Sequence, residues 1–126
     1  MPGVTRSQKA LAAFFTFAGV MHFVIPRRYE AIVPDYLPMS ARHAVAISGV
    51  AEIAGGLGVV PEVTRPVARW WLIAVLAAVF PANVHMATSP EKISGLESST
   101  IPRWALWARL PLQAVFMLWV WRATGA

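Results

Sequence analysis

The residues best suited to chemistry in this sequence are polar and ionisable side chains that lie inside four long apolar stretches. In chain order they are His22, Glu52, Asn83, His85, Arg109 and Gln113. A charged side chain at membrane depth costs about 2.5–3.5 kcal/mol, so such residues usually face the interior of a helix bundle and mark a functional site. The pattern therefore predicts a polar site inside an apolar bundle.

Glu52 and His22 are the predicted catalytic residues, because a buried carboxyl group can donate or accept a proton and histidine titrates near neutral pH. Each has a structural alternative. Glu52 could form an ion pair with Arg109 that only fixes the register of two helices. His22 could be satisfied by a hydrogen bond to a backbone carbonyl.

The predicted ligand-binding residues are Asn83, His85, Arg109, Gln113 and Tyr29. Asn83 and His85 are two positions apart, about 200° around a helix, so both point inward only if Pro81 distorts the helix. We expect Asn83 inside and His85 towards the interface. Gln113 bonds either Arg109, one turn before it, or a ligand carbonyl. No HxxxH or ExxH spacing is present, so no metal site is predicted.

The composition points to the lipid bilayer. The chain has 126 residues, of which 57% are hydrophobic and 13% charged, against about 25% charged residues in soluble domains. The net charge of +5 is spread along the chain without a run of Lys or Arg, which favours contact with lipid headgroups over nucleic acid. The absence of cysteine excludes disulfides and thiol catalysis.

We predict one all-α membrane domain over residues 1–126, an antiparallel bundle of four transmembrane helices. The expected spans are 10–25, 44–60, 67–87 and 104–121. A Pro-rich interfacial segment with Tyr29 joins the first two spans, with an irregular surface loop as the alternative. The link 88–103 reads as a flexible loop. In this arrangement every polar candidate falls at the same end of the bundle.

Small residues predict which helix is central. Ala51 and Gly55 are four positions apart, as are Ala54 and Gly58, and such pairs let membrane helices approach closely. The second span is therefore expected at the centre of the bundle. Basic residues are balanced between the two sides, five against five, and we expect both termini in the cytoplasm because Arg6 and Lys9 precede the first span.

Four strings in this order resemble the DoxX-like family of small bacterial membrane proteins. They are Gly19-Val-Met-His22-Phe-Val-Ile-Pro26, Ser48-Gly-Val-Ala-Glu52-Ile-Ala-Gly55-Gly56-Leu-Gly58, Pro81-Ala-Asn83-Val-His85-Met86-Ala87 and Arg109-Leu-Pro111-Leu-Gln113. The resemblance covers nearly the whole chain. It implies a four-helix protein of a bacterial-type cytoplasmic membrane, and it makes a non-covalently bound quinone a candidate cofactor, because the family takes its name from a subunit of a thiosulfate:quinone oxidoreductase.

Three functions fit these residues. The first is a membrane pocket for a small hydrophobic or quinone-type ligand, in a subunit associated with redox chemistry. The second is a non-catalytic scaffold of a membrane complex, with a protein partner or a second copy of the chain. The third is a membrane enzyme that uses Glu52 for acid–base chemistry on a lipophilic substrate.

Overall fold

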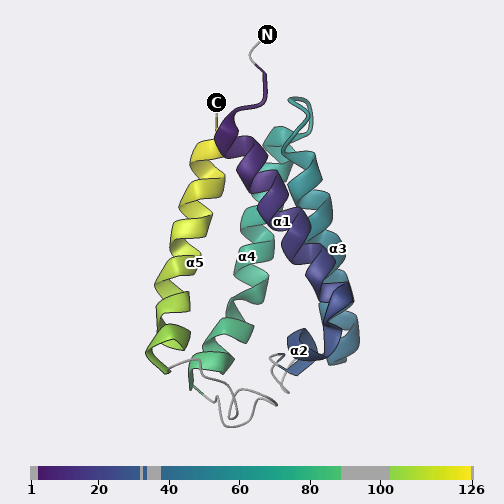
Figure 1. The fold of residues 1–126 in the computed structure, drawn as a ribbon, viewed down its shortest axis with the longest axis vertical. Coiled ribbons are helices and arrows are strands. Elements are labelled where there is room, and N and C mark those ends of the chain that lie inside the picture. Colours follow the sequence, from purple (N-terminus) through teal and green to yellow (C-terminus); the bar gives the residue numbers. More distant parts are fainter. Residues whose placement is uncertain (1–2, 32, 34–37, 89–102, 126) are drawn as a thin grey trace.

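The protein is all-helical in the part of the chain that the structure, a computed structural model, describes: residues 3–31, 33, 38–88 and 103–125. The helices there are α1 (Arg6–Val24), α2 (Pro26–Ala31), α3 (Ala41–Gly58), α4 (Arg65–Thr88) and α5 (Arg103–Thr124). The four long helices alternate in direction, and both termini lie at the same end of the bundle (Figure 1). The predicted all-α class is thus confirmed for these residues.

The long helices begin before the expected spans because polar residues cap and form their first turns. The Thr5 hydroxyl accepts a hydrogen bond from the backbone N–H of Gln8 at 3.1 Å, and the Gln8 side chain accepts one from the backbone N–H of Thr5 at 3.0 Å. This capping box starts α1 at Arg6. Ser40 caps α3 in the same way through the N–H of His43.

The link between the first two long helices begins with α2, whose residues are all at least partly exposed and which contacts α1 and α3. The Pro-rich segment is therefore helical where it follows Pro26, rather than irregular throughout. Residues 32 and 34–37 of this link lie outside the described residues, as does the predicted flexible loop over 89–102.

Glycine brings the helices of the first pair close together. A Cβ atom added at Gly19 of α1 would lie 2.6 Å from the carbonyl oxygen of Gly49 in α3, closer than such atoms approach. On another face of α3, a Cβ at Gly55 would overlap the side chain of Leu72 in α4. Helix α3 contacts α1, α2 and α4. Helices α4 and α5 form the second pair.

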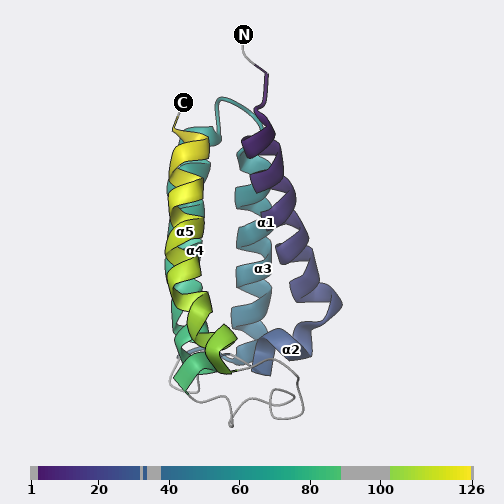
Figure 2. The same ribbon diagram turned by 60° about the vertical axis from the view of Figure 1, so that its left-hand side comes forward.

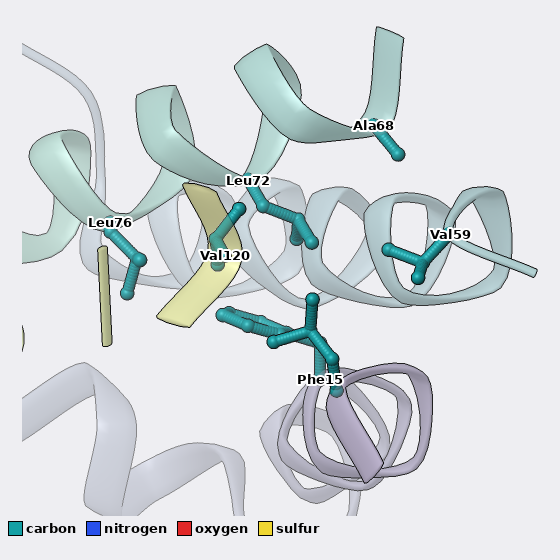
Figure 3. Close-up of a cluster of buried hydrophobic side chains, with 7 residues drawn as sticks. Phe15, Val59, Ala68, Leu72, Leu76 and Val120 are labelled. Carbon is teal, nitrogen blue, oxygen red and sulfur yellow. The ribbon is translucent and has the colours of Figure 1, made fainter. Parts of the chain in front are cut away.

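The hydrophobic core occupies the half of the bundle that carries the termini. Its buried residues come from α1, α4, α5 and the residue that caps the end of α3 (Figure 3): Leu11, Phe15, Val59, Ala68, Leu72, Leu76 and Val120. Towards α2, helices α1 and α5 diverge (Figures 1 and 2).

One stretch of the described residues, Arg65–His85 in α4, is long and apolar enough to cross a membrane, with a mean hydropathy of 1.6. The other long helices carry more polar residues within their apolar sequence. In α3 these include Glu52, and in α5 they include Arg109 and Gln113. The candidate site residues themselves thus lower the hydropathy of the helices that hold them.

Candidate functional site

A cavity of about 630 Å³ lies between the two helix pairs, and all five helices contribute residues to its wall. This volume is in the range of pockets that hold small molecules, about 300–1,000 Å³. Most of the wall is apolar. The polar residues that line it are His22, Tyr29, Ser48, Glu52, Asn83, Arg109 and Gln113.

The cavity brings together six of the seven residues that sequence analysis singled out. The seventh, His85, is half-buried in the last turn of α4 and does not line the wall. Asn83 does line it, as expected from the angle of about 200° between positions two apart on a helix. Ser48 was missed as a site residue, although it lies one turn before Glu52 on the same face of α3.

His22 is held by contacts from three helices. Its Nδ1 donates a hydrogen bond to the carbonyl oxygen of Ala18 at 2.7 Å, the kind of backbone bond considered for this residue. Its Nε2 lies 3.4 Å from the hydroxyl of Ser48. The ring of Tyr29, from α2, stacks on the imidazole with centroids 4.0 Å apart. Since a carbonyl only accepts, Nδ1 carries a proton, and Nε2 of the neutral ring accepts from Ser48.

Glu52 contacts His22 and not Arg109. The residue is 8% exposed, and its Oε2 lies 3.3 Å from Nδ1 of His22. The ion pair with Arg109, considered as the structural alternative for Glu52, is not formed among the described residues, because the glycine contact between α1 and α3 brings His22 against Glu52 while Arg109 lies on α5. Oε2 accepts no hydrogen bond from the described part of the protein. A buried carboxyl oxygen in this state is an uncommon feature that a ligand donor could satisfy.

Asn83 and Gln113 hold α4 and α5 together at the cavity wall. The Asn83 side-chain N–H donates to Oε1 of Gln113 at 2.6 Å, and Nε2 of Gln113 donates to the carbonyl oxygen of Leu76. Gln113 is buried. The bond to Arg109, one of the two alternatives for Gln113, is not formed, since both ends of its amide have these partners. Pro81 lacks the N–H that would bond the carbonyl of Ala77, the residue after Leu76, so α4 is one backbone hydrogen bond short beside this contact.

Arg109 and Tyr29 give the cavity its hydrogen-bond donors. Arg109 lines the cavity and is also exposed on α5. Burial, and to a lesser extent the negative charge of Glu52, raise the pKa of Tyr29 above its usual value near 10, while Arg109 acts in the opposite direction. The Tyr29 hydroxyl therefore keeps its proton at neutral pH. No three His, Asp or Glu residues of the described ranges come close enough to hold a metal ion.

Residues 11–124 match the model of a protein family described as a domain of unknown function, DUF8561. The chain belongs to this family. The match includes every residue that lines the cavity, so the cavity is part of the DUF8561 domain itself. No curated protein matches the chain, and no solved structure matches it. The chemistry of the cavity is accordingly the basis for a functional proposal.

Proposed function

We propose that this DUF8561 protein is a four-span membrane protein whose cavity binds one small hydrophobic molecule with a polar head, such as a quinone. The observation that carries the proposal is the cavity itself. Its wall is mainly apolar, and its polar groups gather from α1, α2, α3 and the paired helices α4 and α5. A largely apolar pocket with a few convergent polar groups is the usual form of a small-molecule site.

The surface supports the four-span arrangement. Large apolar side chains are exposed on every long helix, among them Phe17, Val20, Phe23, Ile47, Val50, Leu57, Val67, Trp70, Val115 and Leu118. Glu52, His22 and Gln113 are buried instead. Soluble proteins rarely expose apolar patches of more than a few hundred Å², whereas in lipid this distribution lowers the free energy. In the cytoplasmic membrane, lipid would cover these side chains.

The donors and acceptors of the cavity suit a head that carries oxygen atoms. Arg109 and Tyr29 can donate hydrogen bonds to carbonyl or phenolate oxygens. Oε2 of Glu52 lacks a hydrogen-bond donor among the described residues and can accept from a hydroxyl group. A quinone offers oxygen atoms that accept hydrogen bonds. A quinol offers such oxygen atoms and also hydroxyl groups that donate. The resemblance to DoxX-like proteins supports the same ligand class, and a redox partner would then exchange electrons with the bound molecule.

Native mass spectrometry of the detergent-purified protein, followed by lipid extraction, tests this proposal. We expect the wild type to carry one defined hydrophobic species per chain. Arg109→Ala should lose most of it, because the head loses its charged donor. Arg122→Ala is the matched control, since Arg122 is also exposed on α5 but lies at the end opposite the cavity.

A wild-type protein that carries no molecule would contradict the proposal. So would equal loss of the molecule from the Arg109 and Arg122 variants, because this would indicate that the lipid is held by the general charge of the surface. In either case the polar cluster would serve to hold the helices together, as in a scaffold subunit.

A further inference from the structure

Helices α1 and α5 meet only towards the end of the bundle that carries the termini. There Gln8 donates a side-chain hydrogen bond to the carbonyl oxygen of Ala123 at 2.9 Å, and the indole of Trp119 donates to the hydroxyl of Ser7 at 2.9 Å. Further along, Phe14 stacks on Phe116 with centroids 5.1 Å apart. Beyond this pair the two helices diverge towards α2 (Figures 1 and 2).

The cavity wall is continuous with the outer surface on this side. Phe14 of α1 and Leu112 and Arg109 of α5 each line the cavity, and each is also exposed. At such side chains the wall of the cavity meets the outer surface and forms a rim. The stacked pair of Phe14 and Phe116 forms the edge of this rim nearest the termini.

We propose that the cavity opens sideways into the bilayer between α1 and α5, and that its occupant is a single-chain amphiphile whose hydrocarbon tail lies in this opening. The proposal rests on the proposed function and adds the route and the shape of the ligand. Arg109 stands at the rim to bind the head. From Arg109 to Phe116 the rim runs two helical turns, about 10 Å at 1.5 Å per residue, and the exposed side chains between these two residues are apolar.

The opposite side of the cavity is the competing route. Ile47 of α3 and Ala78 of α4 also line the cavity and are exposed. That side differs in two ways. Helix α3 packs more extensively on α4 than α1 does on α5, with the indole N–H of Trp71 bonded to the carbonyl of Ala51 at 2.8 Å. In addition, no cationic side chain of the described residues lines the cavity from α3 or α4.

A photoreactive fatty acid with a diazirine in the middle of its chain tests the route. The protein is reconstituted in phosphatidylcholine vesicles that contain this probe, illuminated and digested, and the modified residues are mapped. We expect modification of buried residues that line the cavity, such as Phe15, Val75 and Leu76. An excess of unlabelled dodecanoic acid should compete, and Arg109→Ala should lower the yield several-fold.

Single cysteines then locate the opening, because the natural chain has none. Leu112→Cys carrying a bulky maleimide should lose most of the interior modification. Leu118→Cys with the same label is the matched control, since Leu118 lies on the same helix with 49% exposure against 47% for Leu112 and does not line the cavity. Ile47→Cys with the label should retain the modification. Circular dichroism before and after labelling checks the fold of each variant.

Three results would overturn the proposal. If the interior is still modified when Leu112→Cys carries the label, but not when Ile47→Cys carries it, the opening lies between α3 and α4. Loss at both Leu112 and Leu118 would overturn the assignment of the opening to the rim at Leu112, because a label away from the cavity would have the same effect. An interior that the probe never modifies, in a protein that still carries a bound species in native mass spectrometry, would leave the proposed function standing and refute the lateral route. If the probe modifies no interior residue and native mass spectrometry finds no bound species, both proposals fail.

Discussion

His22 and Glu52 lie on neighbouring helices with Nδ1 of His22 3.3 Å from Oε2 of Glu52, yet the geometry assigns them different structural roles. His22 has a carbonyl, a hydroxyl and an aromatic ring as partners. Oε2 of Glu52 has no hydrogen-bond donor among the described residues. The position of His22 therefore depends little on Glu52, and the carboxyl group remains available to a ligand.

This difference predicts opposite effects of two substitutions on stability. Glu52→Gln should leave the melting temperature unchanged or raise it, because it removes a charge and retains the shape of the side chain. His22→Ala should destabilise the protein by about 2 kcal/mol, from one hydrogen bond of about 1 kcal/mol and an aromatic stack of similar size. Thermal melts in one detergent compare them. Equal destabilisation by both would mean that the ion pair holds the helices.

Asn83 and Gln113 should act as a unit. Gln113→Leu removes the partner of both Asn83 and the carbonyl of Leu76, so we expect it to cost about 1–3 kcal/mol. Once it is present, Asn83→Ala should add little, since the bond between the two is already lost. A double-mutant cycle in thermal melts measures this coupling, expected at about 0.5–3 kcal/mol. If the losses of stability from the two substitutions were additive, Asn83 and Gln113 would not act as a unit.

The sequence allowed most of the site residues to be predicted, but not their partners. Apolar stretches identify residues such as Glu52 that lipid would exclude, because hydropathy is a local property. Whether Glu52 meets Arg109 or His22 depends on the distance between helices, which Gly19 and Gly49 set in three dimensions. The burial of Gln8 was not predicted, because Gln8 lies before the expected first span, where a polar residue is ordinary. Its capping box and its bond to Ala123 bury it.

At the scale of the helix, the contact between α1 and α3 depends on glycine. Gly19→Ala should destabilise the protein by about 1–3 kcal/mol, because the new methyl group would meet the backbone of Gly49, which cannot move aside. Gly3→Ala is the control, since a Cβ there has no neighbour within 4 Å. Thermal melts of both variants beside the wild type give the comparison. A Gly19 variant as stable as the Gly3 variant would contradict the packing described.

The helices themselves were predictable to within a few residues. Each expected span overlaps one long helix, and the errors lie at the ends, where caps such as Thr5 and Ser40 determine the first residue. Helix α2 was expected only as an interfacial segment. Its proline occupies the first helical position, where the missing N–H costs nothing, so α2 begins at Pro26, directly after Ile25, the C-cap of α1.

At the scale of the whole molecule, the four-span proposal predicts where a charge is tolerated. Val50 is 59% exposed in the middle of α3, where lipid would surround it. Val50→Arg should cost about 2.5–3.5 kcal/mol of insertion free energy and reduce the amount of protein in carbonate-washed membranes. Val63→Arg is the control, because Val63 is 89% exposed in the turn between α3 and α4. Full recovery of the Val50 variant from membranes would contradict the four-span arrangement.

The central claim is that the cavity holds a molecule, and filling the cavity tests it most directly. Ala82 lines the cavity from α4, whereas Ala13 is exposed on α1 and does not line it. Native mass spectrometry should find the bound species on the wild type and on Ala13→Trp but not on Ala82→Trp, with all three proteins equally helical. A folded Ala82 variant that retains the species, or a wild type that carries none, would contradict the account.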